Sequence, residues 1–190
     1  MKPPSSPVIT HLEKHLGKLR GGWPFDDDKL LIVEFNNRPH KGATTYASLG
    51  VSDVPLKQAK GPKIRQELLF VCGRADWEEA ADLLSTVALQ VRDGGRSLDR
   101  GEVVGPSGPI FAGSPFEAFY CAPPVYFPDE LAALDGVGGA TLVIVWLVPI
   151  TLAEAKFIEK RGWPAFEDLL EEQDLDLTDL HRPPFKLPKN

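Results

Sequence analysis

The chain has 190 residues, of which 43% are hydrophobic and 25% are charged, and its formal net charge is −6. This length suits one domain with one sizeable core, and the composition is too apolar for a disordered chain. No dense cluster of lysines and arginines stands out, and the net charge would repel nucleic-acid phosphates. We therefore expect a single domain over residues 1–190 without direct nucleic-acid binding.

The sequence contains no segment that marks a secreted or membrane protein. The first residues, Met1–Pro7, lack the apolar stretch of a signal peptide. The longest apolar run, Leu142–Ile150, is broken by Pro149 and is far shorter than the about 20 residues of a membrane span. Cys72 and Cys121 are expected as two buried thiols, and a disulfide between them stays open as the alternative. We therefore expect a cytoplasmic protein with no membrane partner.

The N-terminal region predicts an amphipathic helix. Ser6 can cap this helix, and Pro7 suits its first turn. Its apolar face contains Val8, Leu12, Leu16 and Leu19, and Gly21–Gly22 is expected to end it. After a turn at Asp26–Asp28, apolar and β-branched residues predict three strands, at Leu30–Phe35, Ala43–Leu49 and Ile64–Cys72.

The clearest helix of the chain follows Asp76. This residue can cap the helix, and Glu79 completes the spacing of a capping box. One apolar stripe contains Trp77, Ala81, Leu84, Ala88 and Val91, and Gly94–Gly95 is expected to end the helix. The Gly- and Pro-punctuated region that follows predicts short strands near Glu102–Val104, Pro109–Phe111 and Phe116–Tyr120.

The last third of the chain predicts a long loop, one strong strand and two helices. Ala122–Gly139 is rich in proline and glycine and is expected to be the loop. Thr141–Val148 is apolar on both faces, which indicates a central strand covered on two sides. The spacing of Thr151 and Glu154 predicts a capping box and a helix to about residue 161, and a second helix, with Pro164 in its first turn, runs to about residue 172.

These elements together predict an α+β fold. Most strands are joined by connections too short for parallel crossovers. Helices at both ends and in the middle of the chain can cover both sides of a sheet. We expect a mixed, mostly antiparallel sheet flanked by helices on both faces, an α/β/α sandwich.

A search for reactive residues gives no convincing site. His11 and His15 have a spacing that can bind zinc from one helix face, but no third ligand is placed to complete the set, which favours a structural role. Asp26–Asp28 lacks the ligand spacing of a calcium loop and is interpreted as a solvated turn. Neither cysteine begins a predicted helix, and no G-x-S-x-G motif is present. We expect no metal, no cofactor and no catalytic residues.

One feature of the charge distribution exceeds background. Between Trp163 and Leu180 there is no lysine or arginine, and there are seven acidic residues: Glu167, Asp168, Glu171, Glu172, Asp174, Asp176 and Asp179. The whole net charge therefore lies in this stretch, since the rest of the chain sums to +1. A solvated helix face is the simpler interpretation. The alternative is a surface that attracts and holds a basic protein partner.

Several segments in order resemble the suppressor-of-fused (SUFU-like) domain family, from about residue 27 to residue 172. No single motif among them is specific, and the resemblance depends on their combination. The segments are Thr45–Ser52, Arg65–Phe70, Trp77 with Leu83–Leu84, Gly101–Gly105 leading to Pro109–Ile110, Leu142–Ile150, and the helix of Glu154 followed by Gly162.

This resemblance implies a protein-binding module without catalytic residues. The animal relative sequesters a transcription factor, and bacterial relatives are similar to immunity proteins that neutralise toxins, often nucleases. The resemblance therefore implies an immunity or antitoxin-type inhibitor whose partner is another protein, such as a basic toxin. Two alternatives stay open: a hydrolase with a dispersed site in the loops around Ser97–Tyr120, and a scaffold protein without an inhibitory role. The oligomeric state is not indicated by any motif.

Overall fold

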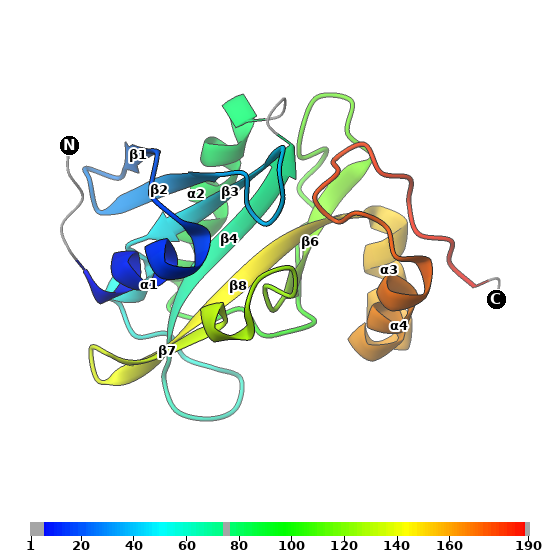
Figure 1. The fold of residues 1–190 in the computed structure, drawn as a ribbon. Helices are drawn as coiled ribbons and strands as arrows, with labels where there is room; N and C mark the ends of the chain where they lie inside the picture. Colours follow the sequence, from blue (N-terminus) through cyan, green and yellow to red (C-terminus); the bar gives the residue numbers. More distant parts are fainter. Residues whose placement is uncertain (1–5, 74–76, 189–190) are drawn as a thin grey trace.

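A computed structural model describes residues 6–73 and 77–188, and it places one eight-stranded sheet at the centre of this part of the chain (Figure 1). The strand order is β1-β2-β3-β4-β8-β6-β5, and β7 pairs with β8 beside this path. The strands are β1 (Gly21–Phe25), β2 (Leu30–Asn36), β3 (Ala43–Leu49), β4 (Arg65–Gly73), β5 (Val103–Val104), β6 (Phe116–Ala122), β7 (Ala133–Val137) and β8 (Ala140–Thr151).

The sheet is mixed but mostly antiparallel, as the sequence predicts. Its one parallel pair joins β4 and β8, with Leu68 opposite Val145. The connection between these two strands contains α2, β5 and β6, which gives the length that a parallel crossover needs. β8 lies between β4 and β6 and is buried along most of its length, so the expectation of a central strand covered on two sides is confirmed.

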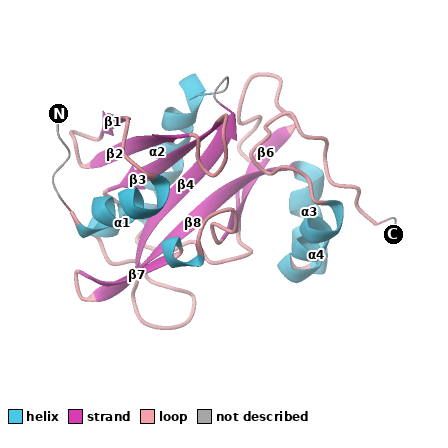
Figure 2. Cartoon of the chain, viewed as in Figure 1, coloured by secondary structure: helices cyan, strands magenta, loops and turns pink. Residues whose placement is uncertain are grey.

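Helices cover both faces of the sheet (Figure 2). They are α1 (Pro7–Leu16), α2 (Trp77–Gly94), α3 (Leu152–Arg161) and α4 (Trp163–Gln173), with short 3-10 turns η1 (Val51–Asp53) and η3 (Asp129–Leu131). α2 packs on one face, where Leu84 and Ala88 meet Tyr46 and Phe70. The other three helices pack on the opposite face, which contains Trp146. The predicted α+β class is confirmed.

The residues after α4 close the second face. Leu177 and Phe185 are buried there, and between them the Arg182 guanidinium lies against the rings of Phe116 and Phe185, at 4.6 and 4.5 Å. Arg182 also donates to the carbonyl of Pro149 and lies 3.5 Å from the fully buried Glu154. A buried ion pair that is also hydrogen bonded in this way fixes the path of the chain.

Two helix starts follow their predicted caps. The Ser6 side chain accepts from the N–H of Ile9 at the start of α1. At the start of α3, Thr151 and Glu154 form the complete capping box. The predicted cap of α2, Asp76, lies outside the described residues.

The structure corrects three predicted elements. α1 ends at Leu16, because Gly17 adopts a positive φ of 86°, and the glycines expected to end the helix instead begin β1. Pro109–Phe111 forms no strand. The amide of Ile110 donates a hydrogen bond to the carbonyl of Phe116, which closes a loop. The expected loop at 122–139 contains η3 and β7, and Gly138–Gly139, with φ of 54° and 79°, makes the tight turn from β7 to β8.

The two histidines with the spacing of zinc ligands, and the two cysteines, take part in the packing of the fold. His11 is buried, and its Nε2 lies 3.1 Å from the carbonyl oxygen of Leu131. His15 packs edge-on against it, with ring centroids 4.9 Å apart. In the described part of the chain, no group of three or more His, Cys, Asp or Glu residues is arranged to hold a metal ion. Cys72 and Cys121 are both buried and are not joined by a disulfide, in agreement with the expectation of two thiols.

Candidate protein-binding surface

α4 presents most of the acidic stretch to solvent. Its buried side is formed by Phe166 and Leu169, and Phe166 packs into the core. The carboxylates on the other side, at Asp168, Glu171 and Glu172, are exposed. The helix ends at Asp174, which adopts a left-handed conformation with φ of 44° and is also exposed. The amphipathic pattern of α4 therefore keeps these carboxylates available to a partner.

Glu167 differs from the rest of the stretch, because it points toward the protein. Its carboxylate accepts from Nε of Arg100 at 3.0 Å and from the hydroxyl of Tyr120 at 2.7 Å, and its side chain is only 20% exposed. Burial alone would raise the pKa of Glu167, but the hydrogen bonds from Arg100 and Tyr120 outweigh it, and the pKa is lowered. Glu167 thus anchors α4 to the sheet.

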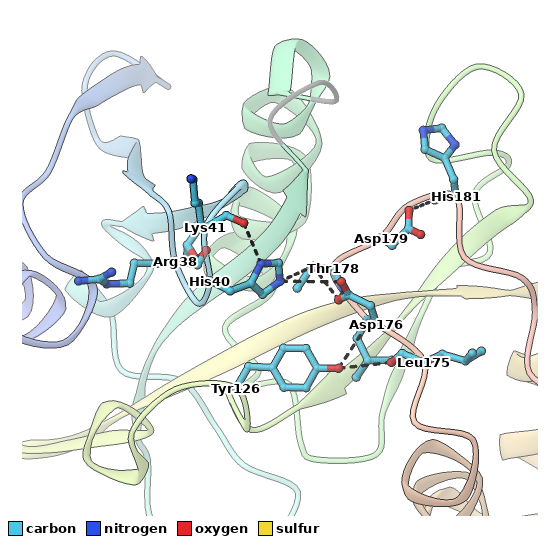
Figure 3. A network of polar contacts seen from close by, with 11 residues as sticks. Arg38, His40, Lys41, Tyr126, Leu175, Asp176, Thr178, Asp179 and His181 are labelled. Carbon is cyan, nitrogen blue, oxygen red and sulfur yellow. Dashed lines mark hydrogen bonds and ion pairs between the residues drawn. The ribbon is translucent and has the colours of Figure 1, made fainter.

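The remaining acidic residues lie on the segment after α4, which contacts the β2–β3 turn (Figure 3). Asp176 accepts hydrogen bonds from the backbone and hydroxyl of Thr178, at 2.9 and 2.7 Å, and lies 3.8 Å from Nε2 of His40. His40 Nε2 is also 3.1 Å from the Thr178 hydroxyl. Asp179 accepts from the amide of His181. Both carboxylates are exposed while they order their own segment.

The loop after β6 contributes apolar side chains beside this acidic segment, and no sequence pattern predicts their exposure. Val125 is 62% exposed and Tyr126 is 38% exposed. The Tyr126 hydroxyl donates to the carbonyl of Leu175 and accepts from the amide of Leu177, both at 3.3 Å. Burial raises the pKa of Tyr126, and the nearby carboxylates of Asp176 and Asp174 raise it further. Residues 123–128 and 174–177 therefore form one continuous surface.

Two of the segments that carry the family resemblance, Thr45–Ser52 and Arg65–Phe70, meet at a different place, around Glu67 on β4. This side chain is fully buried and accepts from the Ser48 hydroxyl, the Gly50 amide, and both the amide and hydroxyl of Ser52. Burial raises the pKa of Glu67 to about 7, although the hydrogen bonds from Ser48 and Ser52 oppose the shift. These contacts tie β3, η1 and β4 together.

A cavity of about 960 Å³ adjoins this glutamate. Its lining includes Arg65 and Glu67 from β4, the start of α1, parts of β1, and Gly138 at the β7–β8 turn. Arg65 donates to the carbonyl of Ser52, and Gly138 lies so close to the Arg65 guanidinium that a Cβ atom there would overlap it. None of the residues that line the cavity belongs to the 97–120 loops. These loops are the place where a hydrolase site was the alternative prediction from the sequence.

The 97–120 loops themselves hold polar groups that are engaged structurally. Ser97 is buried and its hydroxyl donates to the carbonyl of Lys57. The Ser114 hydroxyl accepts from the amide of Phe116. Cys121, just beyond these loops, has a pKa raised by burial, which disfavours the reactive thiolate. Within residues 6–73 and 77–188, no helix is both long enough and apolar enough to cross a membrane.

Known proteins share this fold and part of this sequence. A SUFU homolog from Neisseria gonorrhoeae superposes with a TM-score of 0.75 at 19% identity, covering 96% of each chain. A chain of the Sufu–Fu complex superposes with a TM-score of 0.70 at 16% identity, covering 93% of this chain and 89% of that one. In sequence, the chain is 25% identical to the immunity protein YqcF of Bacillus subtilis over 165 residues, which cover 83% of this chain and 84% of YqcF.

The family model for suppressor of fused protein (SUFU) matches residues 26–183. The match extends beyond the region in which the sequence itself shows the resemblance, and it spans 122–139 and the chain up to the buried Arg182. Because this model covers most of the chain, the protein belongs to the suppressor of fused (SUFU) family.

Proposed function

We propose that this protein is a non-enzymatic, immunity or antitoxin-type inhibitor that neutralises a toxin by stoichiometric binding. The observation that carries the proposal is the similarity to an immunity protein of Bacillus subtilis over 83% of the chain. Membership of a family in which a Sufu chain is found in complex with another protein, Fu, supports a binding role. The two buried thiols, which form no disulfide, support a place in the cytoplasm, where such thiols stay reduced.

We infer that the partner is a basic protein, such as a nuclease, and that it binds the acidic stretch. The contacts are proposed for the exposed carboxylates of Asp168, Glu171, Glu172, Asp174, Asp176 and Asp179, with Glu167 holding α4 in position. A nuclease surface is itself basic, because it must attract phosphates. Opposite charges on the two surfaces would speed association and select the partner.

Co-production of this protein with a candidate toxin, a basic nuclease of the same organism, tests the proposal. We expect restored growth of the host and a one-to-one complex by size-exclusion chromatography with light scattering. The double variant Glu171→Lys/Asp174→Lys should weaken binding by at least about tenfold, since rim charges act mainly on association. The control Glu79→Lys/Asp82→Lys makes the same change in net charge on exposed residues of α2, on the other face of the sheet.

Three results would count against the proposal. Toxicity that persists when the two proteins are produced together would remove the inhibitor role. Equal weakening by both double variants would show that only net charge matters, and binding that is unaffected by raised salt would remove the electrostatic interface.

A further inference from the structure

Two of the three exposed large hydrophobic side chains in the described residues are adjacent in sequence. They are Val125 and Tyr126, 62% and 38% exposed, and the third is Trp163 on α4. Trp163 has a partner within the chain, since the Arg100 guanidinium lies 4.8 Å from its ring and Gly101 packs against it. Val125 is therefore the large apolar side chain whose exposure the packing of the chain does not explain, and the half-buried ring of Tyr126 beside it extends it to one apolar patch.

The loop that carries this patch is held in one conformation. The Tyr126 ring lies 5.0 Å from that of the buried Trp146, and its hydroxyl bonds to the backbone at Leu175 and Leu177. Phe127 is buried in the core and its amide donates to the carbonyl of Pro124. An aromatic side chain that is already fixed loses little conformational entropy when a partner covers it, which is the property of an interface anchor.

The surroundings of the patch are acidic. Asp129 and Glu130 follow it in the chain and are exposed, and Asp174 and Asp176 lie beside Tyr126. Neither segment supplies a compensating basic residue, because the sequence has no lysine or arginine from 101 to 155 or from 163 to 180. The β2–β3 turn brings His40 to 3.8 Å from the Asp176 carboxylate, with Arg38 and Lys41 as its neighbours (Figure 3). The patch is therefore an apolar centre with a polar rim, as in most protein interfaces, and the four carboxylates of this rim outnumber the two permanent cations.

We propose that Val125 and Tyr126 form the apolar centre of the partner-binding surface, and that the partner segment docking there carries an apolar side chain flanked by lysines or arginines. This inference rests on the proposed function and deepens it by moving the centre of the interface from α4 to the loop after β6. The charge selects the occupant. A second copy of this chain in a two-fold contact would bring like carboxylates together, and an anionic lipid surface would be repelled.

Calorimetric titration with the toxin that binds the wild-type protein tests the location. Val125→Asp should lower affinity by at least about tenfold and Val125→Ala by a smaller factor, because the first adds an unpaired charge to the loss of apolar contact. Thr86→Asp introduces the same carboxylate at an exposed position of α2 and should stay within about twofold. A toxin that binds all four proteins equally would overturn the inference and leave the proposed function standing.

A second measurement applies if the candidate toxin does not bind, which would count against the proposed function alone. Amide NMR signals of the protein are followed during addition of a synthetic peptide with Leu-Trp between two pairs of lysines, and of its glutamate counterpart. We expect shifts of Val125, Tyr126 and Leu175 with the lysine peptide only. The inference would be overturned by shifts confined to the amides of the acidic residues of α4, or by equal shifts with both peptides. It would also be overturned by a dimer of this chain that Val125→Asp dissociates.

Discussion

The buried carboxyl of Glu67 and the exposed carboxylates of α4 have opposite roles. The first orders the interior of the fold, and the others face solvent. Glu67 is fully buried, and four donors from β3, η1 and the loop between them converge on it. The carboxylates at Glu171 and Asp174 lie on the surface at the end of α4. The donors to Glu67 belong to the segments that carry the family resemblance, whereas the exposed acidic residues do not form a motif.

The difference indicates what the segment Thr45–Ser52, which carries part of the family resemblance, contributes to the protein. Ser48, Gly50 and Ser52 have the spacing that lets two hydroxyls and two amides reach one buried carboxylate. Such a cluster costs free energy if any member is left without a partner, so it constrains sequence strongly. A binding surface can change with its partner without disturbing this cluster. The segment Thr45–Ser52 therefore belongs to the scaffold, and the partner must be inferred from the surface.

The largest expected effect comes from removing the buried carboxylate. Glu67→Ala leaves four donors without an acceptor and opens a cavity, so we expect the free energy of unfolding to fall by about 4 kcal/mol. Urea denaturation followed by circular dichroism measures the change. Asp82→Ala, at an exposed position inside α2, should change it by less than about 0.5 kcal/mol. A loss of under about 1 kcal/mol for Glu67→Ala would mean that the cluster contributes little to the fold.

The second effect is a pH dependence that belongs to the buried carboxyl. Burial raises its pKa from 4.5 to about 7, so the folded state binds this proton more tightly than the unfolded state does. Its contribution to stability is therefore complete below about pH 4.5 and is lost as the pH rises through about 7.

The variant Glu67→Gln removes this titration and isolates it. The unfolding free energy of the wild type minus that of the variant should fall by about 2.5 kcal/mol between about pH 5 and pH 8, since each pKa unit of the shift within this range corresponds to about 1.4 kcal/mol. Denaturation curves at several pH values measure the difference, in which the other titrating groups cancel. A difference that grows with pH would show that the four donors stabilise the ionised form more than burial disfavours it.

Periodic and capped elements could be predicted from the sequence, and elements with unusual composition could not. The apolar run of β8 and the capping box of α3 each carry a local signal, and both are present as expected. β1 contains two glycines and a proline, and its strand conformation depends on pairing with β2. β7 is a short strand in which only its pairing with β8 overrides the Gly content.

The candidate site divides in the same way. Counting charged residues along the sequence is enough to predict the acidic stretch. It could not separate Glu167 from its neighbours, since the contacts with Arg100 and Tyr120 join residues far apart in the chain. It also could not identify Val125 and Tyr126, because a proline-flanked segment has the composition of a loop. Only the fold shows which side chains of this loop are exposed.

The smallest effects test this division within α4. Glu167→Gln keeps the size of the side chain but exchanges an acceptor oxygen for an amide that cannot accept from Arg100, so we expect a loss of about 1 to 2 kcal/mol, reduced by the partial exposure of the pair. Glu171→Gln, one turn further along the helix and exposed, should change stability by less than about 0.5 kcal/mol. The same denaturation measurement compares the two. Equal losses would mean that the acidic stretch acts as a whole, whereas a loss confined to Glu167→Gln would show that this residue holds α4 in place and leaves the outer carboxylates free for a partner.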